Sequence, residues 1–105
     1  MPASMSNRFA ALGDPVRLKI VETLATRPRS VSEIAGAFDM TLAGLLKHLG
    51  ILEKAGLIQR EKTGRVVTCT LNTKSLATMN DWTLKQIEFW ESGMRRLKKL
   101  VEDDV

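Results

Sequence analysis

Apolar residues recur every three or four positions along most of this chain, the spacing that places them on one face of an α-helix. Two shorter stretches alternate between apolar and polar residues, as the strands of a half-buried sheet do. The pattern predicts helices over residues 8–12, 15–25, 31–38 and 41–56, a β-hairpin formed by 57–62 and 65–71 with its turn at Thr63-Gly64, and a long final helix after Thr73.

Residues that favour helix ends mark the boundaries of these segments. Asp14 can cap the second helix, and Pro15 then stands at its first position, where a missing N–H costs nothing. Ser30 and Glu33 match a capping box, in which each side chain accepts a hydrogen bond from the other residue's backbone N–H. Thr41 is a suitable cap for the fourth helix. These residues therefore support three helix starts independently of the apolar spacing.

The third and fourth helices and the hairpin follow one another in the order of a winged helix-turn-helix. A capped short helix, a turn of about three residues and a second capped helix present the start of the second helix outward. In that helix we expect Leu45, Leu46, Leu49 and Leu52 to face the core. Its outward side and the hairpin would meet a DNA groove and the flanking phosphates. The residues expected at this interface are Thr41, Leu42, Ala43, Gly44, Lys47, His48, Arg60, Lys62 and Arg65.

The charge of the chain is concentrated on the same segment. The formal net charge is +4, from 16 basic and 12 acidic side chains. Residues 41–75 hold six Lys or Arg and two Glu, a net of +4, against +1 for residues 1–40 and −1 for residues 76–105. A polyanion is the natural partner of such a patch. Charge alone leaves open the alternative of a solvated basic face that binds no ligand.

Two single residues could have either a functional or a purely structural role. His48 is the only histidine, and it either contacts a groove or phosphate or serves in capping or packing. Cys69 is the only cysteine, which excludes an intrachain disulfide and suits a reducing cytoplasm. We expect Cys69 to be a half-buried strand residue, because a redox-sensing thiol would prefer a resolving cysteine. Trp82 and Trp90 are expected in core or dimer packing rather than in a ligand cage.

The final helix carries an apolar seam at the spacing of a coiled coil. Its members, from Thr83 through Ile87 to Val101, are separated by intervals of 4, 3, 4, 3 and 4 residues. A small domain does not need so long a seam for its own core, so we expect a partner helix. The predicted dimer interface consists of Phe9, Leu12, Ile87, Trp90, Met94 and Leu97.

Length and composition limit the other possibilities. With 105 residues we expect one domain, with a flexible segment at 1–6 and a winged-helix domain at 7–105 whose dimerisation helices span 7–13 and 74–102. No apolar run approaches the roughly 18 residues of a membrane span, and the N-terminus lacks the apolar stretch of a signal peptide. Since the chain has no second histidine, no glycine-rich phosphate loop and no nucleophile motif, we expect no enzymatic activity, no metal site and no cofactor.

Three motifs in order resemble those of the ArsR/SmtB family of bacterial repressors. Residues 9–20 (FAALGDPVRLKI) resemble the opening "ALxDPxRLxIL", and residues 32–35 (SEIA) resemble the third-helix motif "xELA". Residues 47–58 (KHLGILEKAGLI) resemble the reading-helix motif "[R/K]HLxxLxxAGL[V/I]", and Gly64-Arg65 resembles the tip of the wing. The resemblance covers about residues 8–72. The last helix, with Phe89-Trp90-Glu91, resembles a metal-free subgroup.

The resemblance implies a symmetric homodimer built from the first and last helices. It also implies binding to double-stranded DNA, at an operator with dyad symmetry, and repression of the protein's own operon. This sequence lacks the Cys pair that metal-sensing members carry near the third helix, and its last helix lacks histidine. Leu42 and Leu46 stand where many members have polar residues, so the reading helix is unusually apolar. Two alternatives stay open: a winged-helix module that binds protein through Leu42-Ala43-Gly44, and a thiol-redox-sensing repressor that uses Cys69.

Overall fold

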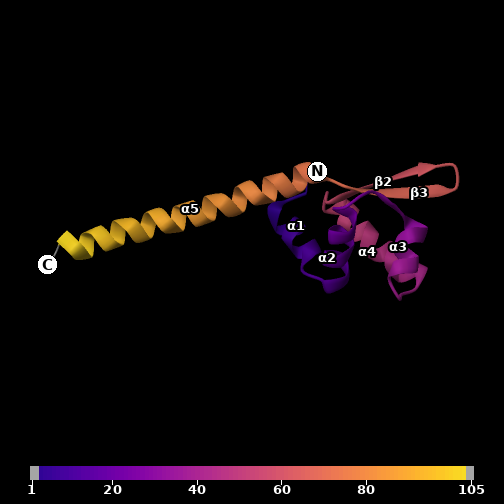
Figure 1. Cartoon of the computed structure of the whole chain (residues 1–105), viewed down its shortest axis with the longest axis horizontal. Helices are drawn as coiled ribbons and strands as arrows, with labels where there is room; N and C mark the ends of the chain where they lie inside the picture. The colour runs from indigo at the N-terminus through magenta and orange to yellow at the C-terminus, as the bar shows by residue number, and fades with distance from the viewer. Residues whose placement is uncertain (1–2, 104–105) are drawn as a thin grey trace.

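The computed structural model describes residues 3–103, which form five helices and three strands. The first four helices and the sheet make a small body, and the last helix extends from it as a rod (Figure 1). In chain order the elements are α1 (Met5–Leu12), α2 (Pro15–Leu24), β1 (Arg29–Ser30), α3 (Val31–Ala37), α4 (Leu42–Lys54), β2 (Ile58–Thr63), β3 (Val66–Leu71) and α5 (Thr73–Asp103).

Side-chain caps begin the first four helices. The Asp14 carboxylate accepts hydrogen bonds from two backbone amides of α2, and Ser30 and Glu33 form the reciprocal capping box at α3. These two predicted caps are therefore confirmed, and so is the third, Thr41, which caps α4. The start of α1 differs from the expectation: the helix begins at Met5, inside the segment predicted to be flexible, because Ser4 caps it by accepting from the Asn7 amide. The first two residues of that segment lie outside the described range.

The strands form an antiparallel sheet in the order β1-β3-β2. The two-residue strand β1 was not predicted, since it is too short to show an alternating pattern. Its Arg29 pairs with Cys69 of β3. The hairpin turn lies one residue later than predicted, at Gly64-Arg65, because Thr63 still pairs with Val66. Gly64 has a φ of +64°, which suits the first central position of a type II′ turn.

The core lies between the helices and the inner face of the sheet. α4 supplies three leucines that are fully buried, and β2 and β3 each add a buried side chain. Leu46 was expected among them but is 41% exposed, because it lies about 100° around α4 from Leu45. The residues with the most complete burial are Ile20, Ile34, Leu45, Leu49, Leu52, Leu57, Ile58 and Cys69.

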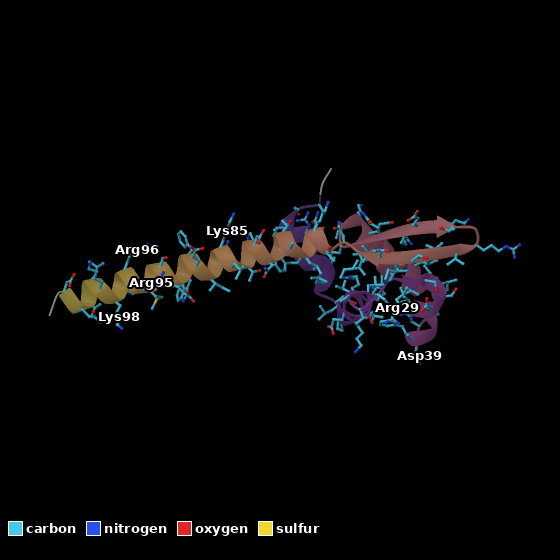
Figure 2. The ribbon with its side chains drawn as sticks, turned by 45° about the horizontal axis from the view of Figure 1, so that its top comes forward. Arg29, Asp39, Lys85, Arg95, Arg96 and Lys98 are labelled. Carbon is cyan, nitrogen blue, oxygen red and sulfur yellow. The ribbon has the colours of Figure 1, made fainter. Side chains whose placement is uncertain are left out.

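The helix α5 touches the body only through its first turns. Ser75 and Met79 are its buried residues, and beyond them the helix runs past α1 into solvent. Its 31 residues give the described chain extents of 71 × 27 × 24 Å. Figure 2 shows Lys85, Arg95, Arg96 and Lys98 spaced along this rod, away from the body. The predicted long final helix is confirmed.

Gly56 joins the end of α4 to the sheet and to α5. It has a φ of +77°, and its amide donates to Glu53 O at 2.9 Å while the Leu57 amide donates to Leu52 O at 3.0 Å. These two bonds are those of a Schellman cap, which closes a helix with a left-handed residue. The Gly56 carbonyl then accepts from Ser75 Oγ at 2.6 Å and Asn72 Nδ2 at 2.9 Å. One glycine therefore fixes where α5 leaves the body.

Replacing Gly56 with alanine should destabilise the protein by about 1–2 kcal/mol, the cost of a left-handed conformation for a residue with a Cβ. The added Cβ would meet only Ala3 and Ser75 at 3.7 Å, an ordinary contact distance, so backbone strain is the cause. Urea unfolding at constant protein concentration measures the loss. The matched control is Gly36→Ala in α3, where a Cβ meets nothing within 4 Å; it should be neutral or stabilising. Equal losses in both variants would contradict the explanation.

Candidate nucleic-acid interface

The outward side of α4 combines apolar and basic side chains. Leu42 is 55% exposed, and Ala43, Leu46 and Lys47 are exposed with it. Gly44 is half-buried, and a Cβ there would approach Thr41 Oγ1 to 3.1 Å. Lys47 forms no ion pair within 4.0 Å in the part of the chain that the structure describes. This surface can offer methyl contacts and one free cation to a partner.

The first turn of α4 is capped by Thr41, whose hydroxyl oxygen accepts from the Gly44 amide at 3.1 Å. The Thr41 hydroxyl hydrogen and the other first-turn amides have no partner within the helix itself. Amides at a helix start point along the axis and carry partial positive charge. The start of α4 is therefore able to receive a phosphate oxygen.

His48 lies at the edge of this surface and faces α2. Its Nδ1 lies 3.3 Å from an Arg17 guanidinium nitrogen and 3.9 Å from the Asp14 carboxylate. A backbone hydrogen bond from Arg17 is the main cause that lowers the pKa of Asp14. Arg17 also donates from Nε to Ala11 O at 2.6 Å. The sequence did not indicate this role of Arg17, because only the packing of α2 on α4 brings the two residues together.

The basic residues of the hairpin fall into two groups. Arg60 donates twice to the Glu53 carboxylate, at 2.9 and 3.2 Å, and this bond lowers the pKa of Glu53 and raises the pKa of Arg60. Lys62 and Arg65 are exposed and make no ion pair within residues 3–103. Arg60 is therefore held against α4, and the tip of the hairpin carries the free charges. Figure 1 shows this hairpin projecting over α3 and α4, opposite the free end of α5.

The predicted dimer residues lie on one side of the rod and at its base. Ile87, Trp90, Met94 and Leu97 are all exposed, Trp90 by 69%. Phe9 of α1 is 40% exposed and packs on Trp82 of α5, with ring centroids 5.4 Å apart. Leu12 is half-buried and packs against the core. The Phe9–Trp82 contact therefore joins α1 to α5 near the start of the seam.

Cys69 was expected to be half-buried and is fully buried, opposite Arg29 of β1 and Arg60 of β2. The Cys69 side chain is fully buried because it belongs to the hydrophobic core. Burial raises the pKa of the Cys69 thiol, so the reactive thiolate is disfavoured. Within the described residues, no group of three or more His, Cys, Asp or Glu side chains is placed to hold a metal ion.

No single helix among residues 3–103 has the length and apolar character of a membrane span. Taken together, α3 and α4 meet the requirement by length and composition, but a bend of 118° separates them.

Comparisons with known proteins all find helix-turn-helix transcriptional regulators or their DNA-binding domain. A helix-turn-helix domain family matches residues 12–61. The transcriptional repressor SdpR of Bacillus subtilis is 32% identical over 83 residues, which cover 79% of this chain and 92% of that repressor. The crystal structure of an ArsR family transcriptional regulator superposes with a TM-score of 0.79 at 38% identity, over 83% of this chain and 96% of the other.

A third comparison concerns the fold alone. The homodimeric winged helix-turn-helix DNA-binding domain of a possible ArsR-family regulator from Mycobacterium bovis, solved by NMR, superposes with a TM-score of 0.65 at 24% identity. The match covers 83% of this chain and 82% of that domain. The expected fold, mainly α with a small β-sheet in a winged helix-turn-helix, is confirmed.

The burial of Cys69 predicts a protected thiol. In native protein Cys69 should react with Ellman's reagent at least about tenfold more slowly than in urea, because only the exposed thiolate attacks. The matched control is Thr70→Cys in a Cys69→Ala background, which places a thiol at the exposed neighbouring position of the same strand. That thiol should react rapidly in the native state. Rapid native labelling of Cys69 itself would restore the redox-sensing alternative.

Proposed function

Because the chain belongs to the ArsR family of winged helix-turn-helix transcriptional regulators, we propose that it acts as a homodimeric repressor at an operator with dyad symmetry. The observation that carries the proposal is the set of free cations beside an exposed reading helix: Lys47 on α4 and Lys62 and Arg65 on the hairpin. In this proposal the protein works in the cytoplasm, represses its own operon, and needs no enzymatic activity, cofactor or metal.

In the proposed docking mode α4 enters the major groove. Lys47 would contact a guanine or a phosphate, and the exposed Leu42, Ala43 and Leu46 would meet thymine methyl groups. Thr41 and the first amides of α4 would hold a phosphate at the edge of the groove. These apolar side chains cannot form hydrogen bonds to bases, so contacts to thymine methyls should contribute much of the discrimination.

The hairpin would follow the DNA backbone beside the groove. Lys62 and Arg65 can neutralise phosphates directly, whereas Arg60 would have to leave Glu53 first. We therefore assign Arg60 mainly to holding the hairpin on α4. His48 would donate from Nε2, because its Nδ1 faces a guanidinium that can only donate.

The proposed dimer forms along α5. Its seam is exposed on a single chain, and truncating a buried Trp or Leu typically costs about 2–5 kcal/mol, so covering the seam would stabilise an assembly strongly. A second copy presents the same seam, and two-fold pairing would cover both at once. The two α4 helices would then stand about 34 Å apart, one turn of DNA. The residues assigned to this interface are Phe9, Leu12, Ile87, Trp90, Met94 and Leu97.

The exposed Leu42 and Leu46 favour one rival, a winged-helix module that binds a protein through α4. The two proposals differ in their response to salt, because contacts to phosphate release counterions and apolar contacts do not. Recovering genomic DNA bound to the purified protein gives the operator and the first test.

Six phosphate contacts by the free cations of a dimer should give a slope of about −5 for log affinity against log salt concentration. Arg65→Ala should weaken specific and non-specific binding alike and reduce the slope by about 2, since each symmetric change acts twice. Lys85→Ala is the matched control, because it removes the same charge from α5 (Figure 2). Salt-independent affinity, or equal losses in both variants, would exclude the docking mode.

Leu97→Asp should yield a monomer and abolish operator binding, although Leu97 lies on the rod and not on the reading helix. The reason is that the seam would bury an unpaired carboxylate twice in each dimer. Sedimentation and gel shift measure the two effects. Ser92→Asp adds the same charge about 140° around α5 from Leu97 and should remain dimeric. A wild type that sediments as a monomer at micromolar concentration would contradict this dimer.

A further inference from the structure

A cavity of about 430 Å³ lies between α1, α2 and α4. Phe9 is the α1 residue that the proposed dimer covers, whereas Asn7 and Ala10 line the cavity. These two residues lie about 160° and 100° around α1 from Phe9, so the proposed dimer would leave the cavity open. Its volume is within the range of small-molecule sites. Its lining includes Asn7, Ala10, Arg17, Ile51, Lys54 and Ala55.

The cavity is lined by two cationic residues, Arg17 and Lys54, and by apolar residues. Neither Arg17 nor Lys54 makes an ion pair within 4.0 Å across residues 3–103. The carboxylate closest in sequence to Arg17, that of Asp14, accepts from backbone amides at the start of α2. Alanine and isoleucine side chains form most of the remaining wall, and Asn7 adds an amide. Such a lining suits a ligand with one acidic group and an apolar body.

Arg17 connects this cavity to the reading helix. Arg17 lines the cavity, and its guanidinium lies 3.3 Å from His48 Nδ1. Because a guanidinium only donates, Nδ1 is the acceptor in this contact, and a neutral ring that makes it carries its proton on Nε2. His48 therefore depends on Arg17 both for its orientation and for the nitrogen that carries its proton.

We propose that the cavity binds a small organic anion, and that the bound anion draws Arg17 away from His48 and lowers operator affinity. A charge-assisted bond between guanidinium and carboxylate is stronger than a guanidinium–imidazole bond. A bound carboxylate therefore replaces the His48 ring as the acceptor for Arg17. Freed from Arg17, His48 loses its fixed proton position. By linkage, DNA lowers the affinity for the anion by the same factor. The DNA part of this inference rests on the proposed function.

The test uses the full chain with two probes, benzoate and inorganic phosphate. Calorimetry without DNA should show saturable benzoate binding, and phosphate, which has no apolar body, should bind at least about tenfold more weakly. Lys54→Gln should weaken benzoate binding about tenfold by removing one cation. Lys85→Gln on α5 is the matched control and should bind benzoate normally. No saturable benzoate binding, equal binding of phosphate, or an unchanged Lys54→Gln variant would overturn the site.

The coupling to DNA is measured separately. His48 is the only histidine, so its ring nitrogen signals in NMR are unambiguous. Benzoate should move them from one tautomer toward a mixture, and saturating benzoate should weaken operator binding in the wild type and not in Arg17→Gln. Saturated cavities with unchanged His48 signals and unchanged operator affinity would overturn the coupling. If the chain fails to bind DNA even without benzoate, the proposed function is wrong. The calorimetry would still show whether the cavity binds benzoate.

Discussion

Three leucines on one side of α4 hold the reading helix in place. Leu45, Leu49 and Leu52 are fully buried at helical spacing, and their burial is worth roughly 1.5–3 kcal/mol each. The same helix then has its opposite side free for a partner. A reading surface so anchored loses little conformational freedom on binding, because the helix is already rigid. The position of the hairpin depends on the same anchor, since β2 begins four residues after α4 ends.

The Schellman cap at Gly56 extends this order to α5. The Gly56 carbonyl accepts hydrogen bonds from Asn72 and Ser75 at the start of that helix. These bonds connect the end of α4 directly to the beginning of α5. The direction of the rod relative to the reading helix is therefore set within each chain. A dimer formed on the rod would consequently fix the spacing of two reading helices without any contact between them.

The sequence predicted what depends on local chemistry. Helix spacing and caps such as Asp14 and Ser30 could be recognised because the residues that satisfy one another lie within four positions. The exposed seam of α5 was predictable for the same reason. The hairpin turn was placed one residue early, because the positive φ of Gly64 fits either central position until the strand register is known.

Features that arise only from packing could not be predicted in this way. Strand β1 exists because β3 offers it a partner, and that pairing places Arg29 opposite Cys69. The bond between Arg60 and Glu53 joins a strand to a helix, so the sequence counted as free a charge that the fold neutralises. The contact between Arg17 and His48 spans 31 positions. For Leu46 the apolar character of the residue was a poor guide, since its position around α4 decides its exposure.

The neutralised arginine changes the electrostatic picture of the protein. Once Arg60 is paired with Glu53, each chain offers DNA three free cations from the predicted interface, and Glu61 lies beside them on the hairpin. Few contacts per chain make a single domain a weak binder, because affinity falls steeply with each phosphate contact that is missing. Joining two domains makes the second contact intramolecular and raises affinity without any new side chain at the DNA. In the proposed dimer the exposed seam of α5 would thus be the feature on which operator affinity depends most, although it lies on the element most remote from α4 and the hairpin.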